Sequence, residues 1–171
     1  MTASNVQCHY EDVPLNHPTP KPDSVSDAQV LSWAETILAQ RFQRSNYLTH
    51  PGDARDYLKV ILAHHSTELF GMIFLDNQHG ILGFNVLFQG TIDGAAVYPR
   101  EVVKAALKRN AAAVVLAHNH PSGIAHPSMA DRNITQRIIS ALETVDIRVL
   151  DHLIIAGTQT VSFAELGLLS P

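Results

Sequence analysis

The chain has 171 residues, of which 46% are hydrophobic and 16% charged, the composition of one folded domain with a sizeable core. Its formal net charge is −4, whereas proteins that bind nucleic acid or anionic membranes typically carry a surplus of basic residues. Ten histidines stand against one cysteine, Cys8, which excludes an internal disulfide framework and a thiolate-rich zinc cluster, so a transition-metal site would need imidazole and carboxylate ligands.

The composition of the N-terminal region predicts a flexible leader. Four of the nine prolines fall within residues 1–24, between polar residues. The first residues lack both the basic region and the apolar region of a signal peptide. No apolar run in the chain is long enough for a transmembrane helix, and we therefore expect a cytoplasmic protein.

Two helices are expected before the first strand. The first helix is expected at residues 25–46. The polar residues of Ser24–Asp27 cap its start, and apolar side chains recur along it with the helical period. Asp53 is a suitable N-cap for the second helix, in which the same period returns. The apolar positions are Val30, Leu31, Ala34, Ile37 and Leu38 in the first helix and Tyr57, Leu58, Ile61 and Leu62 in the second.

A hairpin is predicted next. Glu68–Asp76 is mostly apolar, residues 77–80 form a turn, and Ile81–Gln89 has the pattern of a second strand. Pro99 suits the first position of a helix that continues to about Asn110. The wholly apolar run 111–117 is typical of a central strand that is buried on both faces.

The C-terminal third continues the alternation of helices and strands. A helix begins at Ser128, and residues 147–150 and 152–156 have the pattern of two strands. Residues 157–159 form a turn, and a short segment at 163–169 ends the chain. Helices that alternate with strands around a buried central strand predict an α/β or α+β sandwich.

The most informative stretch follows the central strand. Residues i and i+2 at the end of a strand point to the same face, so His118 and His120 present two imidazoles to one ion. Asp131 lies in the first turn of the next helix, and the loop between contains Pro121, Gly123 and Pro127, which favour a fixed reversal toward the imidazoles. Two imidazoles and one carboxylate leave one tetrahedral position open, the pattern of a catalytic zinc.

A hydrolytic site also needs a general base and an oxyanion donor. Glu68 is the natural candidate for the base, because it begins a strand that is otherwise free of acidic residues. Ser128 stands between the imidazole pair and the carboxylate and is the candidate donor.

Each of these residues also has a structural interpretation. The spacing from Ser128 to Asp131 is that of a helix-capping motif, which is compatible with a role in the site. An H-x-H pair at a strand end is often two ordinary histidines, and Glu68 could be a carboxylate at a helix–strand junction. The site interpretation rests on their joint occurrence in order along the chain.

The complete pattern resembles the JAMM/MPN+ metalloprotease motif, a glutamate followed by H-x-H-x7-S-x-x-D. Seven residues separate His120 from Ser128, and two separate Ser128 from Asp131, as in the motif. The surrounding sequence, roughly residues 48 to 166, is similar more specifically to the RadC family. The stretches that carry this likeness are Glu68–Asp76, Phe88–Asp93, Pro99–Lys104, Ala117–Gly123 and Leu150–Ile155.

This resemblance implies a cytidine-deaminase-like α/β sandwich of the JAB/MPN type, with a central mixed β-sheet flanked by helices. It implies one zinc ion held by His118, His120 and Asp131, with Glu68 as general base and Ser128 as oxyanion donor. The implied reaction is zinc-dependent hydrolysis of a peptide or isopeptide bond, with a peptide or protein as substrate.

The chain departs from longer RadC-like proteins, which carry a helix-hairpin-helix region of the kind that holds DNA. Here a leader at residues 1–24 and one helix at residues 25–46 precede the JAB/MPN domain expected at residues 48–171. This arrangement and the acidic net charge disfavour direct binding of nucleic acid.

Two other functions stay open. One is a non-catalytic, metal-binding RadC-like module that acts in DNA repair or in a protein complex. The other is metal-dependent action on nucleic acid, although the P-C-x-x-C signature of zinc deaminases is absent from the sequence.

Several further polar residues have ordinary interpretations. Arg100, Lys104 and Lys108 fall at helical spacing and form a basic stripe, which we interpret as a solvated face; docking of an acidic partner or phosphate is the alternative. His126 is interpreted as a loop residue, and His152 as a residue that supports the site or packs the strand. His64 and His65 are expected at a helix end.

Overall fold

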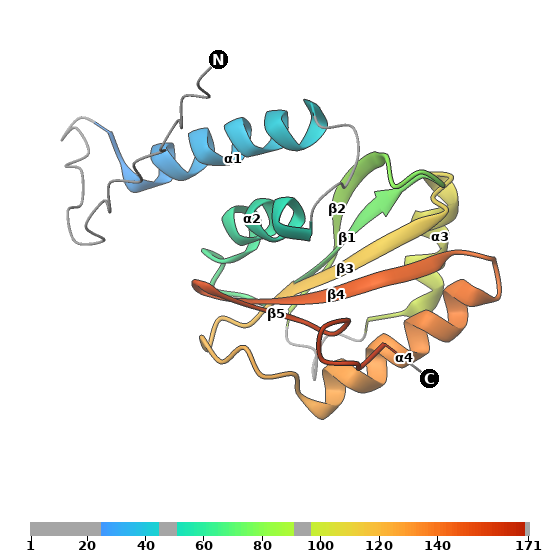
Figure 1. Ribbon diagram of the computed structural model, residues 1–171. Coiled ribbons are helices and arrows are strands. Elements are labelled where there is room, and N and C mark those ends of the chain that lie inside the picture. Colours follow the sequence, from blue (N-terminus) through green and yellow to red (C-terminus); the bar gives the residue numbers. More distant parts are fainter. Residues whose placement is uncertain (1–24, 45–50, 91–96, 170–171) are drawn as a thin grey trace, which may run out of the picture.

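The computed structural model describes residues 25–44, 51–90 and 97–169. In this part of the chain a single five-stranded sheet is covered by helices on both faces (Figure 1). The elements are α1 (Asp27–Arg44), α2 (Pro51–Leu62), β1 (Leu69–Leu75), β2 (Ile81–Gln89), α3 (Pro99–Lys108), β3 (Ala113–Asn119), α4 (Met129–Glu143), β4 (Arg148–Ala156) and β5 (Gln159–Ser162).

The sheet has the strand order β2-β1-β3-β4-β5, with β1 and β3 in its interior. Every residue of β1 and β3 is buried, as expected for apolar strands covered on both faces. β3 and β4 are parallel and are joined by the crossover helix α4, whereas all other neighbouring strands are antiparallel. The expected α/β fold with a mixed sheet flanked by helices is therefore confirmed.

Different helices cover the two faces of the sheet. On one face, Leu58 and Leu62 of α2 pack against β1, β3 and β4. On the other face, apolar residues of α3 and α4, including Val102 and Ile138, pack against the opposite sides of β1 and β3. α1 lies beside α2, away from the sheet (Figure 1). The burial of apolar surface on both faces fixes the ends of β1 and β3, from which the site is built.

The hairpin of β1 and β2 and the helices at Pro99 and after Ser128 form where they are predicted. Two predictions at the C-terminus are wrong. Residues 148–156 form one strand instead of two, and residues 159–162 form the short edge strand β5, which the sequence does not reveal.

The physical reason is Asp151, a polar residue that interrupts the apolar pattern inside β4. Its carboxylate accepts hydrogen bonds from the backbone nitrogens of His152 and Ala164 and from the Ser162 hydroxyl, so the strand continues through it.

The predicted leader at residues 1–24, with Cys8, lies outside the described residues, as do residues 91–96 between β2 and α3. The division of the chain into a leader, an N-terminal helix and a domain at residues 48–171 stays a prediction. Over the described ranges, none of the helices has the length and apolar character needed to cross a membrane.

Candidate metal centre

His118 lies at the end of β3 and His120 just after it, where the chain leaves the sheet for the loop that leads to α4. His118 is fully buried and lies opposite Phe70 of β1 and Ile154 of β4. His120 follows β3 directly, and its backbone nitrogen bonds the Ile155 carbonyl at 2.8 Å, which keeps the chain extended. The two rings therefore share one face, as predicted.

The carboxylate of Asp131 comes from the first turn of α4 and is buried. A capping box fixes it there: the Ser128 hydroxyl accepts from the Asp131 backbone nitrogen at 3.1 Å, and Asp131 Oδ2 accepts from the Ser128 backbone nitrogen at 2.7 Å. The cap and the site thus use the same two residues. Substituting the cap serine would be expected to loosen a ligand position as well as the helix end.

The three side chains bring one candidate ligand atom each to a common point, all within 4.8 Å of one another. The Nε2 atoms of His118 and His120 are 2.8 Å apart, and they lie 3.2 Å and 3.5 Å from the two oxygens of Asp131. Ligand atoms placed about 2 Å from a tetrahedral zinc lie about 3.3 Å from each other. The spacing of the three residues therefore fits a zinc-sized ion.

A buried chain of hydrogen bonds determines which nitrogen of His118 carries the proton. Thr135 donates its only hydroxyl proton to the Asp131 carbonyl at 2.6 Å, so Thr135 Oγ1 must accept from His152 Nδ1, also 2.6 Å away. Neutral His152 then offers only Nε2 as an acceptor, and His118 Nδ1 donates to it at 2.8 Å. The Nε2 atom of His118 is left with a lone pair that faces the site.

His120 reaches the same state through one contact. Its Nδ1 lies 2.7 Å from the carbonyl oxygen of Ile124, which can only accept, so Nδ1 carries a proton, and in the neutral ring Nε2 keeps the lone pair. The third group, Asp131 Oδ1, is buried and has no hydrogen-bond partner among the described residues. Three acceptors that converge in a buried site repel one another, and a metal cation among them would satisfy all three.

The electrostatic surroundings favour a neutral ring at His118 and a charged carboxylate at Asp131. Burial lowers the pKa of His118, although Asp131 opposes that shift, and burial lowers the pKa of His152 well below its ordinary value. The Asp131 carboxylate raises the pKa of the less buried His120. For Asp131, burial acts to raise the pKa, but the neighbouring rings of His118 and His120 hold it well below its usual range. Asp131 is therefore ionised when it meets a cation.

Glu68 lies immediately before β1 and is half-buried. Its negative charge favours the protonated forms of His118 and His120. The Glu68 carbonyl accepts from the backbone nitrogen of Gly90 at 2.9 Å, so the end of β2 helps to hold this residue. The pairing of β1 with β3 brings the segment that begins at Glu68 alongside the strand end that carries His118, although the two are about fifty residues apart in sequence.

Asn119, which stands between the two histidines, was not identified from the sequence. Strand alternation turns its side chain away from the imidazole pair and toward the start of β1. There Oδ1 accepts from the Leu69 backbone nitrogen at 2.7 Å, and Nδ2 donates to the carbonyls of His65 and Thr67 at 3.2 Å and 3.1 Å. One buried amide therefore ties the histidine strand to the segment that carries Glu68.

Substituting Asn119 with aspartate tests this connection. The change keeps the acceptor for Leu69 but places a carboxylate oxygen against two carbonyls, so we expect a loss of about 1–3 kcal/mol in the free energy of unfolding. Metal binding is expected to persist, because no ligand atom changes. Denaturant titration and metal analysis check both expectations, with Asn133→Asp at an exposed position of α4 as the matched control.

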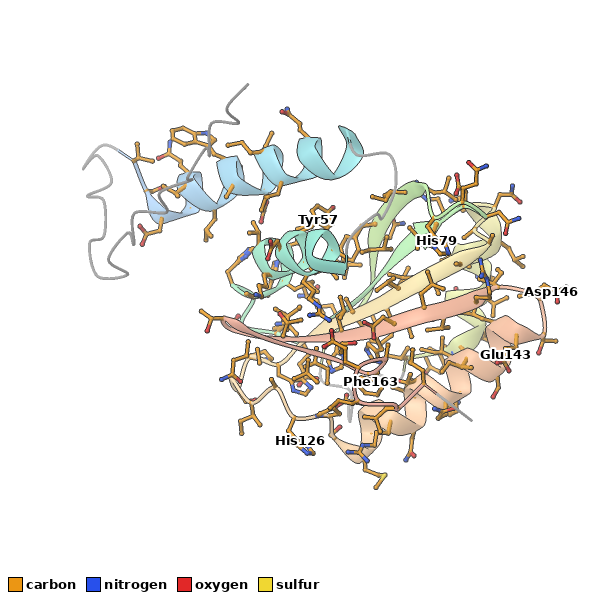
Figure 2. All side chains as sticks on the ribbon, in the orientation of Figure 1. Tyr57, His79, His126, Glu143, Asp146 and Phe163 are labelled. Carbon is orange, nitrogen blue, oxygen red and sulfur yellow. The ribbon has the colours of Figure 1, made fainter. Side chains whose placement is uncertain are left out.

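Other histidines singled out from the sequence stay apart from this centre. His126 is exposed on the loop between β3 and α4, where Figure 2 shows it at the surface. His64 lies just beyond α2, with Nδ1 3.0 Å from the Val60 carbonyl and Nε2 3.6 Å from Glu35. His152 supports the site through its contact with His118.

Comparison with known proteins identifies the family. A family profile described as "RadC-like JAB domain" matches residues 48–168. The chain belongs to the RadC family. Similar curated relatives are named only as UPF0758 proteins, and these names state no reaction.

Three of these relatives give the extent of the likeness. The chain is 56% identical over 138 residues to a protein of Stutzerimonas stutzeri and 56% identical over 140 residues to one of Aeromonas hydrophila. It is 54% identical over 138 residues to a protein of Vibrio parahaemolyticus. These matches cover 81–82% of this chain but only 62% of each relative.

Proposed function

We propose that this RadC-like chain is a zinc-dependent hydrolase of the JAMM type that cleaves peptide or isopeptide bonds in the cytoplasm. One observation carries the proposal: the candidate ligand atoms of His118, His120 and Asp131 lie within 4.8 Å of one another, with the Nε2 atoms of the two rings 2.8 Å apart. Family membership supports it, and the five residues of the JAMM pattern all occur in order, with the required spacing from His118 to Asp131.

The three ligands would hold the zinc ion and leave a tetrahedral position open. When bound, zinc would supply Lewis-acid chemistry, polarising a carbonyl and lowering the pKa of water to about 7. The buried chain from His118 to Thr135 fixes one ligand ring before any metal arrives, so little reorganisation accompanies binding.

Glu68 is proposed as the group that moves protons. A carboxylate beside the open position would take a proton from the attacking water and return it to the departing amine. The Gly90 nitrogen bonds the backbone carbonyl of Glu68, and the Asn119 side chain bonds the chain just before it. The sheet therefore fixes the backbone position of Glu68.

Ser128 is proposed as the donor to the developing oxyanion. In this structure its hydroxyl donates its single proton to Asp131 Oδ2 at 2.7 Å. For catalysis the hydroxyl must turn toward the substrate, and coordination of a metal by the Asp131 carboxylate would weaken the contact that now holds it.

Metal analysis tests the proposal. The purified wild-type chain is expected to contain zinc in an equimolar amount, and His120→Ala is expected to lose it because one of three ligands is gone. His126→Ala, an exposed histidine on the same loop, is the matched control and should keep the metal. A chain that binds no metal, or a His120→Ala variant that retains it, would contradict the site.

A screen of the zinc-loaded chain against peptide and isopeptide libraries tests the reaction. Cleavage that disappears on chelation and returns with zinc is the expected result. Binding of metal without cleavage of any library member would favour a non-catalytic module.

A further inference from the structure

A groove runs between the edge strand β2 and helix α3, on the face of the sheet that carries the metal centre. Its volume is about 930 Å³, and its floor is largely apolar, with Leu87, Phe88 and Ala105 among the lining residues. Concave surfaces lined mainly by apolar side chains are common places for ligands and other chains to bind.

β2 forms one edge of the sheet among the described strands. Its sequence, ILGFNVLFQ, has nine residues with no charge and no proline, and Leu82 and Val86 are 36% and 44% exposed. Natural proteins protect long edge strands with charges, prolines, bulges or short length, because an open edge pairs readily with another strand. The register of β2 with β1 shifts at two places, and Arg109 bonds the Leu82 carbonyl at 3.3 Å, but no residue of β2 carries a charge or a proline ring that would keep another strand away.

The rim of the groove on the α3 side is basic in a chain whose net charge is −4. Lys104, Lys108 and Arg109 line it, with Glu101 as the acidic residue. Glu101 forms an ion pair with Lys104 at 2.8 Å. The Arg109 guanidinium lies over the Phe74 ring and donates to Asn85 Oδ1 at 2.9 Å. The rim therefore presents fixed positive charge above an apolar floor.

We propose that an extended, acidic segment of another polypeptide binds in this groove as an additional strand beside β2. Its backbone pairs with the edge of β2, alternate apolar side chains cover Leu87 and Phe88, and its carboxylates meet Lys104 and Lys108. A second copy of the chain fits less well. In a symmetric antiparallel β2–β2 pair both α3 helices lie on the same face, which brings two basic rims together.

Ring contacts connect the groove with the metal centre. Phe88, which lines the groove, packs edge-on against Phe70 at 6.2 Å, and Phe70 stacks on His118. The end of β2 is bonded to Glu68 through the Gly90 nitrogen. The docking goes beyond the proposed function, because it concerns binding and holds whether or not a bond is hydrolysed.

Fluorescence anisotropy with the full chain tests the proposal. The probes are labelled peptides as long as β2, one alternating glutamate and valine and one alternating lysine and valine. The acidic peptide is expected to bind at least about tenfold more tightly. In the double variant K104E/K108E this preference should reverse, whereas R137E/R148E, two exposed arginines outside the groove, should leave it unchanged.

A third probe separates strand pairing from simple charge attraction. The acidic peptide with alternate backbone nitrogens methylated keeps its charge but loses its hydrogen-bond donors, and it should bind at least about tenfold more weakly. Circular dichroism verifies that the variants are folded, and Lys108→Glu alone provides a milder change.

Three results would overturn the proposal: no binding of the acidic peptide, equal binding of both charged peptides, or a K104E/K108E variant that behaves as wild type. A dimer in light scattering that Leu82→Lys dissociates would also overturn it, because a second copy would then occupy the edge. Loss of hydrolysis in any of these variants does not bear on the docking, so the test is independent of catalysis.

Discussion

Replacing Glu68 with glutamine should reduce hydrolysis of a substrate found in the library screen by about two to four orders of magnitude. The amide is nearly the same size as the carboxylate but cannot accept a proton from water or return it to the leaving amine. The zinc content should not change, since His118, His120 and Asp131 are untouched. Measured together, rate and zinc content separate proton transfer from metal binding.

The control for Glu68→Gln is Glu143→Gln at the last residue of α4, at the other end of that helix from the ligand Asp131 (Figure 2). Both variants remove one negative charge, so a general charge effect would appear in both. A Glu68→Gln variant that retained its metal and its full rate would contradict the role proposed for Glu68, whereas loss of zinc would show that Glu68 stabilises the metal.

The candidate ligands could be predicted from the sequence because the geometry that joins them is local. The alternation of a strand puts His118 and His120 on one face, and the capping box places Asp131 at a known position of the next helix. These rules act over two or three residues, and the short loop between the two elements limits where the carboxylate can go.

The residues that support the ligands could not be predicted in the same way. His118 and His152 are 34 positions apart, and their contact depends on the parallel register of β3 and β4. Asn119 reaches the segment before β1 across about fifty positions, which depends on the antiparallel register of β1 and β3. Strand order and register come from burial over the whole sheet, and no short pattern in the sequence encodes them.

The same reason explains the two errors at the C-terminus. Asp151 looks like a break in a strand because a carboxylate is costly to bury. Its three hydrogen bonds come from His152 and from Ser162 and Ala164, which only the folding of the C-terminal segment brings alongside. A buried polar residue whose hydrogen-bond partners are distant in the sequence cannot be told apart from a loop residue by the sequence alone.

Breaking the chain His118–His152–Thr135 should weaken zinc binding although no ligand is removed. In Thr135→Val the shape is kept but His152 Nδ1 loses its acceptor, so His152 no longer has to offer Nε2 to His118. The proton of His118 is then free to move to Nε2, the atom that faces the metal. We expect a loss of about 10–100-fold in zinc affinity, measured by competition with a chelator.

Thr144→Val provides the matched control at the other end of α4. Thr144 also donates its hydroxyl proton to the carbonyl four residues earlier, Ser140, at 3.0 Å, but it is exposed and remote from the ligands. Any loss of helix stability from removing such a bond should therefore appear in both variants. A fall in zinc affinity that is confined to Thr135→Val identifies the contact with His152 as its cause.

Two substitutions at His152 distinguish positioning from packing. In His152→Gln the side-chain oxygen can still accept from His118 and the amide nitrogen can donate toward Thr135, so zinc affinity should largely recover. His152→Leu fills the space without either bond and should lose affinity at least as strongly as Thr135→Val. Nitrogen NMR of the metal-free protein should show His118 protonated at Nδ1 in the wild type and not in the leucine variant. If the His152→Leu variant bound zinc as tightly as the His152→Gln variant, His152 would only fill the core. The orientation of His118 would then have to come from β3 alone.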